Sequence, residues 1–283
     1  MSIGRVLSVL IEYELRSSLA RKRVVILLAT TFLLEIGVYF VLTRLPASFI
    51  DSIRPYAWVV GLIAPSTVLL HVLGLTIGSS TSAEEYETGT ADFWFTRPMS
   101  RFEYFTGKVI GGFMLLVVLI FSYSFIALSV SWYVFGPQQR VDLFMNGLVS
   151  SVFSALPFYL MGIAFGELIR RGMVATIVAG TTFFGCVIYT SYANFIAVIN
   201  NDGSLLDTVK LLPTWGATNI PISVVSEQID TPQLRLFIAG PLGISDPGLD
   251  LSLAAINVVA YSLLFFSAAF IRFRYSDVTR RAQ

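Results

Sequence analysis

The sequence predicts an all-α polytopic membrane protein with six transmembrane helices, and three observations lead to this fold class. Of its 283 residues, 55% are hydrophobic and only 13% are charged, whereas a soluble domain carries about 25% charged residues. The mean hydropathy is +0.75. The apolar residues occur in long blocks, each sufficient to cross about 30 Å of hydrocarbon as a helix. We therefore expect one transmembrane domain over residues 1–283.

Residues 1–20 predict an amphipathic helix. Apolar side chains recur at helical spacing between Ile3 and Leu10, and polar side chains between Arg5 and Arg16 fall on the opposite face. Its unbroken apolar length is too short to span a bilayer. We therefore expect this helix to lie along the membrane interface.

Six candidate spans follow, at residues 24–43, 56–80, 109–135, 143–168, 173–199 and 251–271. Proline removes a backbone donor, so we expect Pro65 and Pro157 to kink the second and fourth spans. Residues 200–250 form an external segment that contains several prolines. A loop of this length is seldom structureless, and we expect short helices and turns there, some of them re-entrant.

The distribution of lysine and arginine sets the expected orientation. With the amino terminus inside, fourteen of the 19 basic residues fall in cytoplasmic segments and five in external ones. This asymmetry follows the positive-inside rule. Both termini and residues 82–108 are then cytoplasmic, and we expect a multi-pass protein of the cell membrane. The net charge of +1 gives no indication of nucleic acid binding.

The segment after the second span is charged and carries two patterns typical of a helix start. Ser82 with Glu85, and Ser100 with Glu103, each place a hydroxyl at an N-cap position and a carboxylate three residues later. Gly89 permits a sharp bend between them. We expect a short folded structure at the membrane surface rather than a slack linker.

No catalytic motif is visible in the sequence. A phosphate-binding Gly-x-x-x-x-Gly-Lys-Ser/Thr loop is absent, as are the common hydrolase and metalloprotease patterns. One histidine, His71, and one cysteine, Cys186, do not suffice for a metal site of imidazoles and thiolates within one chain. We expect a protein that is not an enzyme.

Five polar residues within the spans are candidates for a translocation path. Glu35 contacts a substrate or ion, or it is a protonated or hydrogen-bonded acid that faces another helix, and we leave both interpretations open. For His71 we favour hydrogen bonding between helices over transport chemistry. Thr181, Thr182 and Tyr189 give the fifth span a hydroxyl-rich face suited to lining a pathway.

Small residues recur at four-residue spacing in three places, Gly74 with Gly78, Gly107 with Gly111, and Gly162 with Gly166. This spacing lets helices approach closely. For each pair we favour packing inside one bundle over a dimer seam.

Three short motifs follow the second span. They are Glu84, Glu85, Gly89 and Thr90, then Arg97-Pro98-Met99-Ser100-Arg101, then Gly107-Lys108 with Gly111. In this order they resemble the first cytoplasmic loop of type-2 ATP-binding-cassette (ABC) transporter permeases. Residues 92–95 depart from it, because family members usually carry an apolar, often leucine-rich stretch there. The topology is also similar, with an amphipathic first helix, six spans and a large external segment before the last span.

The resemblance implies a permease subunit, an exporter, that dimerises with a second permease copy and is driven by separate cytoplasmic ABC ATPase subunits. This chain would bind no cofactor, and ATP and Mg would be bound by the ATPase. The loop would form a coupling helix in a cleft on the ATPase. By position, the contact would comprise Glu84, Glu85, Glu87, Gly89, Thr90 and Asp92, an apolar anchor of Phe93, Trp94 and Phe95, and a charged rim of Arg97, Arg101 and Lys108. Alternatively, the aromatic residues are anchors at the membrane interface.

Two other functions stay open. One is a non-transporting scaffold or mechanotransmission subunit, in which an ATPase-driven loop relays force to an external partner through residues 200–250. Tightly packed central helices without a vestibule would favour it. The other is a secondary transporter coupled through Glu35, although ion-coupled carriers usually show several buried polar groups near the midplane.

Overall fold

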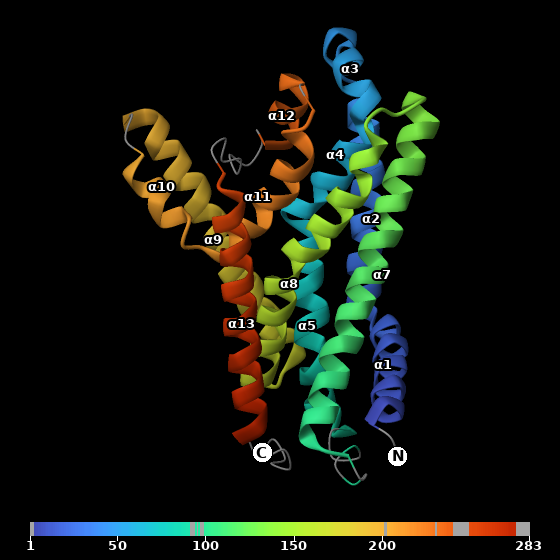
Figure 1. Cartoon of the computed structure of the whole chain (residues 1–283). Helices are drawn as coiled ribbons and strands as arrows, with labels where there is room; N and C mark the ends of the chain where they lie inside the picture. The colour runs from blue at the N-terminus through green and yellow to red at the C-terminus, as the bar shows by residue number, and fades with distance from the viewer. Residues whose placement is uncertain are drawn as a thin grey trace.

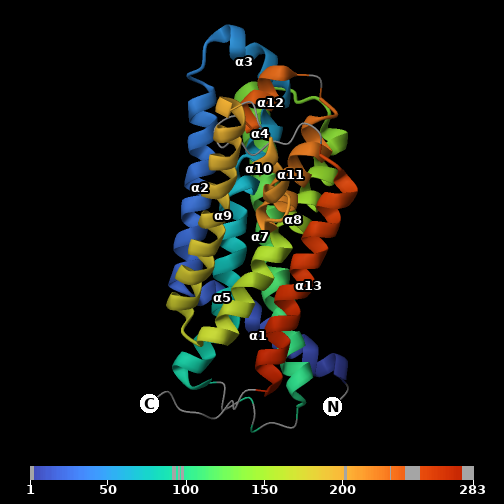
Figure 2. The same cartoon turned by 90° about the vertical axis from the view of Figure 1, so that its left-hand side faces the viewer.

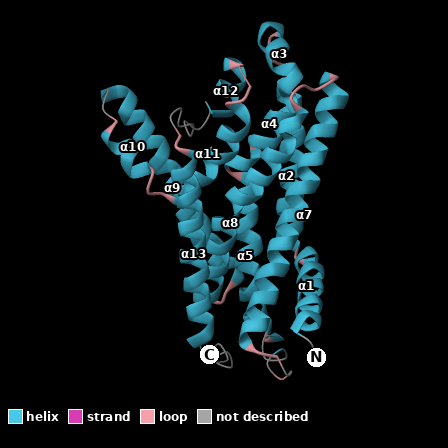
Figure 3. Cartoon of the chain, viewed as in Figure 1, coloured by secondary structure: helices cyan, strands magenta, loops and turns pink. Residues whose placement is uncertain are grey.

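The computed structural model describes residues 3–90, 94, 96, 99–200, 203–229, 231–239 and 249–275, and these residues form helices joined by short turns, with no strand among them (Figure 3). The all-α class predicted from the sequence is confirmed. The α-helices are α1 (Ile3–Ala20), α2 (Lys22–Leu42), α3 (Ala47–Ile53), α4 (Ala57–Ile63), α5 (Leu69–Thr88), α7 (Arg101–Phe135), α8 (Phe144–Ile169), α9 (Gly172–Asn200), α10 (Ser204–Val209), α11 (Pro213–Ser226), α12 (Pro232–Ala239) and α13 (Leu251–Tyr275). Short 3₁₀ turns are η1 (Arg54–Tyr56), η2 (Pro65–Thr67) and η3 (Val141–Leu143).

Five of the helices in the described residues, α2, α7, α8, α9 and α13, are long and apolar enough to cross a membrane. They match the first, third, fourth, fifth and sixth predicted spans. The longest is α7, with 35 residues, because its capped first turn begins well before the predicted start of its span. Pro157 lies inside α8, which continues through it.

The second predicted span is a broken helix. A pair of helical segments, Ala47–Thr67 and Leu69–Thr88, is bent by 45° at the break, and the count reaches six only if the pair is one span. Pro65 opens the 3₁₀ turn η2 at this point. Because proline lacks an N–H and crowds the preceding turn, it interrupts the helix here instead of only kinking it.

The long helices run roughly along one axis, and both termini lie at the same end (Figures 1 and 2). The end of α5 and the start of α7 lie at this end too, so we call it the loop end (Figure 1). Here α1 packs beside the first half of α7 (Figure 1). A Cβ added at Gly107 would lie 2.8 Å from Leu10, and one at Gly111 would lie 2.8 Å from Glu14. This glycine pair therefore allows α1 to pack closely against α7 of the same chain.

The centre of the bundle is the contact of α5 with α8. A Cβ at Gly78 would lie 2.1 Å from the carbonyl oxygen of Tyr159, and one at Gly162 would lie 2.4 Å from that of Leu75. The two backbones touch, as expected for small residues in a helix–helix contact. The prediction of packing inside one bundle is confirmed at these glycines.

Most of the remaining apolar surface faces outward. Of the most apolar window of each helix, 72% is buried in α8, but only 22% in α2 and in α13, 28% in α9 and 33% in α7. Exposure of this much apolar surface to water is energetically unfavourable, whereas contact with lipid chains is not. Helices of this length and surface are typical of a protein inserted in a membrane.

The predicted external segment contains three short helices, as the sequence suggested. Of these, α11 is buried along nearly its whole length and packs between α8 and α13. A Cβ at Gly216 would lie 2.5 Å from the carbonyl oxygen of Ala254 in α13. This helix therefore enters the group of long helices near the end opposite the termini (Figure 1).

Candidate functional site

A cluster of buried charges lies at the loop end, where α1, the end of α5 and the start of α7 meet. Arg21, between α1 and α2, is 3.1 Å from Glu14 of α1 and 2.7 Å from Glu84 of α5. Lys108 of α7 is 2.7 Å from Glu85 of α5 and 3.4 Å from Glu14. We call these five residues the ion cluster.

Three residues of the ion cluster are shielded from solvent, whereas the Glu84 side chain is 21% exposed. Glu14 is 0% exposed, Lys108 is 3% exposed and Glu85 is 4% exposed. Burial of a charge costs several kcal/mol unless partners replace its water. The hydroxyl groups of Ser18 and Tyr104 supply part of this replacement, the first donating to Glu14 over 2.9 Å and the second donating to Glu85.

Two features of α1 and α7 build the cluster. Glu14 follows Leu10 by one helical turn, so it lies on the buried face that packs against α7. The glycines of α7 leave room for the Glu14 side chain, and Lys108 lies beside them in the chain. The sequence analysis missed Glu14, Arg21 and Tyr104, although a carboxylate on the apolar face of an amphipathic helix was a usable signal.

Trp94 covers the cluster from the loop. It is 8% exposed, and its ring centroid lies 4.9 Å from that of Tyr13 and 6.4 Å from that of Tyr104. Burial raises the pKa of the Tyr13 phenol above its usual range, and the charge of Glu85 raises it further. We predicted Trp94 as part of an exposed apolar anchor, but its ring packs between α1 and α7 of its own chain.

One of the two predicted helix starts is wrong and the other is confirmed. α5 runs through Ser82 to Thr88 without a break, and Glu85 binds Lys108 instead of a free backbone N–H. Ser100, by contrast, caps α7, because its hydroxyl accepts from the Glu103 N–H over 3.1 Å and its N–H donates to the Glu103 carboxylate over 2.8 Å. The sequence pattern is the same, but only the second is preceded by non-helical backbone.

The other predicted coupling residues also have places in the fold. Gly89 ends α5 with φ of +70°, as its predicted bend requires. Glu87 accepts from the Gly172 N–H at the start of α9 over 3.1 Å. Thr90 is exposed beside Thr88, with 2.9 Å between their hydroxyl oxygens.

Arg101 donates to the Arg274 carbonyl over 3.1 Å, which links α7 to the end of α13. Asp92, Phe93, Phe95 and Arg97 lie outside the described residues.

The five predicted path residues do not share one environment. Glu35 is buried on α2 against Gly61 of α4. His71 is buried elsewhere, and its ring lies 4.5 Å from Phe158 of α8 and 5.7 Å from Phe183 of α9.

The three hydroxyl residues of α9 face outward. Thr181 and Thr182 are exposed and donate to carbonyl oxygens one turn earlier in their own helix. Tyr189 is also exposed, and its hydroxyl lies 2.6 Å from that of Thr208 in α10. In this conformation they belong to the outer surface of α9, together with its apolar side chains.

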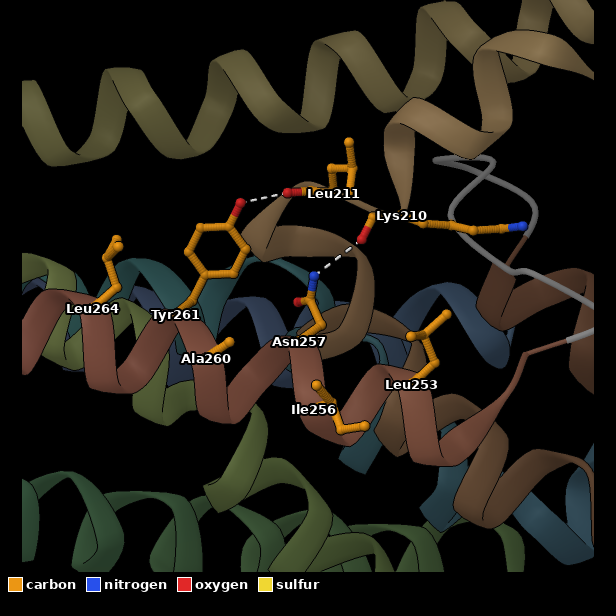
Figure 4. Close-up of a pocket in the computed structure, with 8 residues that line it drawn as sticks. All are labelled: Lys210, Leu211, Leu253, Ile256, Asn257, Ala260, Tyr261 and Leu264. Carbon is orange, nitrogen blue, oxygen red and sulfur yellow. Dashed lines mark hydrogen bonds between the residues drawn. The ribbon is translucent and has the colours of Figure 1, made fainter.

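An apolar groove of about 420 Å³ lies on the outer side of α13, where the turn after α10 crosses it (Figure 4). Asn257 donates to the Lys210 carbonyl over 3.0 Å, and Tyr261 donates to the Leu211 carbonyl, so the two side chains hold the turn on α13. Ile256 and Leu264 belong to the apolar wall of the groove. The Asn257 amide N–H and the Tyr261 hydroxyl are thus engaged within the fold, whereas Asn257 Oδ1 has no hydrogen-bond partner among the described residues.

The described residues contain no group of three or more histidine, cysteine or acidic side chains arranged to hold a metal ion. The ion cluster offers opposite charges in contact rather than a nucleophile beside a base. The cluster joins α1, α5 and α7 through contacts whose loss would leave a buried charge unpaired. Comparison with protein-family models and with curated proteins finds no match for this chain.

Proposed function

We propose that this chain is the transmembrane subunit of an ATP-driven transporter of the ABC permease type, an exporter that works as a dimer. Separate cytoplasmic ATPase subunits would drive it through residues 82–108 and would bind the ATP and Mg. The ion cluster beneath Trp94 carries the proposal. It ties the predicted coupling segment to α1, α5 and α7, so a displacement of the segment moves these helices together.

Force applied at the loop end would pass through several short contacts between helices. Packed elements move as rigid bodies when their contacts are strong and short. Arg21 and Lys108 each contact two carboxylates from different helices, and Trp94 packs against α1 and α7 at the same place. Glu87 extends the linkage to α9. A push on the loop is therefore distributed over most of the bundle instead of bending one turn.

The proposal includes a six-span topology in the cell membrane. The bent pair formed by Ala47–Thr67 and Leu69–Thr88 counts as the second span. α1 lies along the cytoplasmic membrane surface, both termini are cytoplasmic, and α10, α11 and α12 are on the external side. The excess of basic residues at the loop end supports this orientation.

Co-purification in detergent with the ATPase encoded nearest to this chain tests the proposal. Trp94 and Glu85 are unsuitable targets, because both are buried within the chain. We would combine Phe93→Ser with Phe95→Ser, the predicted anchors beside Trp94. The matched control combines Trp132→Ser with Tyr133→Ser, two exposed aromatic residues at the opposite end.

Wild type and the control should each bring down the ATPase in a fixed ratio, and the loop variant should not. A loop variant that retains the ATPase shows that the anchor was assigned wrongly. Failure of the ATPase to bind wild type, after other ATPases of the same genome have been tried, would overturn the proposal.

A second function, the force relay without transport, is favoured by one observation. The central α5–α8 contact is closed to the level of backbone atoms at Gly78 and Gly162. Structures of the dimer with its ATPase, with and without nucleotide, separate the two functions. A vestibule that opens beside α5 in one state supports transport, whereas closed central packing in both states supports the relay.

A further inference from the structure

Glu35 is buried among hydroxyl groups that are all engaged elsewhere. It is 0% exposed, and neither of its carboxyl oxygens has a hydrogen-bond partner of good geometry among the described residues. It lies on the inward face of α2, one turn before Tyr39. This is an unusual position for an acid, because buried carboxylates normally accept several hydrogen bonds.

The neighbouring donors are already used. The Tyr39 hydroxyl donates to the Ala127 carbonyl over 2.8 Å, and the Ser131 hydroxyl lies 2.7 Å from both the Tyr39 hydroxyl and that same carbonyl. On α7, the Tyr123 hydroxyl donates to the Gly61 carbonyl over 2.7 Å. The nearest donor to an ionised Glu35 is therefore the Tyr39 hydroxyl, which is already engaged with the Ala127 carbonyl.

The site is also closed by direct contact. A Cβ at Gly61 would lie 2.0 Å from the Tyr39 hydroxyl oxygen and 2.4 Å from Glu35 Oε1. Both oxygens therefore press against the backbone of α4 beside each other. A metal cation would need several free oxygen ligands around it. Here the hydroxyl groups and the Gly61 carbonyl are already engaged in hydrogen bonds. A proton needs one acceptor, and the second lone pair of the Tyr39 oxygen offers it.

We propose that Glu35 is a proton-binding site that joins α2 to α4 and α7. The carboxylic acid holds its proton while the three helices are packed together. When they separate, water reaches Glu35, the O–H bond breaks, the proton passes to water, and the carboxylate is hydrated. Proton release and separation of α2 from α4 are thus one event. This inference is independent of the proposed function, because it rests on a different part of the bundle.

The titratable groups that face Glu35 in the described residues are few. Tyr39 comes from its own helix and Tyr123 from α7. The part of α4 in contact is Gly61, which carries no side chain. The proton therefore has no competing base at the site. The short turn η2 connects α4 to α5 in the chain. A displacement of α5 is therefore passed through η2 to the contact between α4 and Glu35.

Infrared spectroscopy of the purified protein in lipid nanodiscs tests the proposal through the carbonyl stretch of a protonated carboxylic acid. Wild type should show this band at about pH 6.5, where exposed carboxyl groups are already ionised. Glu35→Gln should lack it, and Glu12→Gln, at an exposed glutamate of α1, should keep it. Tyr39→Phe should keep the band but shift it to the frequency of an acid without a hydrogen bond.

The coupling to helix separation is tested by two glycine substitutions. Gly61→Ala must push α4 away from Tyr39 and Glu35, so its band should fade as the pH is raised. Gly37→Ala, on α2 with nothing within 4 Å of the added methyl group, should behave as wild type. If Gly61→Ala does not fold, exchange of the band in D₂O replaces it, and the wild-type proton should exchange more slowly than that of Tyr39→Phe.

Three results would overturn the proposal. The first is a wild-type spectrum that lacks the band at about pH 6.5, because Glu35 is then ionised. The second is a band that disappears when sodium replaces choline in the buffer, because the ligand is then a cation. The third is a Gly61→Ala band as insensitive to pH as that of wild type, because contact with α4 then does not control the proton.

Discussion

Lys108 and Glu85 form a contact of 2.7 Å between α7 and α5, and neither side chain is more than 5% exposed. A pair of the same kind, Lys210 with Asp207, has nearly the same length, 2.8 Å, but its side chains are 41% and 78% exposed. The two pairs differ in burial and not in distance. Burial decides what the loss of one partner costs, because water replaces a lost partner only at the exposed pair.

The first prediction compares these two lysines. Lys108→Met should lower the free energy of unfolding by about 3–5 kcal/mol, because it leaves Glu14 and Glu85 buried without their cation. Lys210→Met should change it by no more than about 1 kcal/mol. Denaturant titration in mixed micelles measures both. Equal effects of the two substitutions would show that the ion cluster is accessible to water.

The second prediction refines the first through a double variant. Adding Glu85→Gln to Lys108→Met removes one of the uncompensated charges, so the pair of changes should cost less than the sum of the two single changes. The sign of this coupling is the readout. Strict additivity would mean that the 2.7 Å contact does not exist in the protein in micelles.

The third prediction concerns Trp94. Trp94→Ala should detach the loop from Tyr13 and Tyr104 and cost about 3 kcal/mol, as for other buried aromatic residues. Trypsin should then cleave after Arg101 faster than in wild type, because the start of α7 loses its cover. Trp132→Ala serves as the control, since Trp132 is 52% exposed at the other end of α7. Cleavage rates that are equal in all three proteins would contradict the placement of Trp94.

Hydropathy was sufficient to predict five of the long helices, because an apolar block in a membrane satisfies its backbone polar groups within a helix. It failed at Pro65, where the sequence shows an interruption but not whether the helix bends or breaks. That outcome depends on tertiary neighbours such as Tyr123, whose hydroxyl binds the Gly61 and Leu62 carbonyls just before the break. Local sequence carries no information on these contacts.

The candidate site was predictable only in part for the same reason. A capping box is a local pattern, so Ser100 and Glu103 were identified correctly, but Ser82 and Glu85 match the same pattern in the interior of a helix. Whether Glu85 faces a backbone N–H or Lys108 depends on where α7 packs. The family resemblance implied a charged rim for Lys108, but its contact with Glu14 on the buried face of α1 makes it an interior cation.

The fourth prediction tests the close contact of α5 with α8. Gly78→Ala should lower the free energy of unfolding by about 1–3 kcal/mol, because the added methyl group would lie 2.1 Å from the Tyr159 carbonyl oxygen and must push the helices apart. Gly180→Ala, on α9 with nothing within 4 Å, should be neutral or stabilising by up to about 1 kcal/mol. Thermal unfolding in the same detergent compares them. A Gly78→Ala protein as stable as wild type would show that the two helices are looser than described.

The fifth prediction tests the orientation of the bundle, on which the proposed function depends. In a Cys186→Ser background, Thr90→Cys, just after α5, and Asp51→Cys, in α3, place single thiols at exposed positions at opposite ends of the molecule (Figure 1). A maleimide that does not cross membranes should label Asp51→Cys in intact cells, because the segment between the first and second spans is expected outside. It should label Thr90→Cys only after the membrane is opened. Labelling of both thiols from outside would place the loop end away from any cytoplasmic ATPase, and the permease function would then be wrong even though the fold is right.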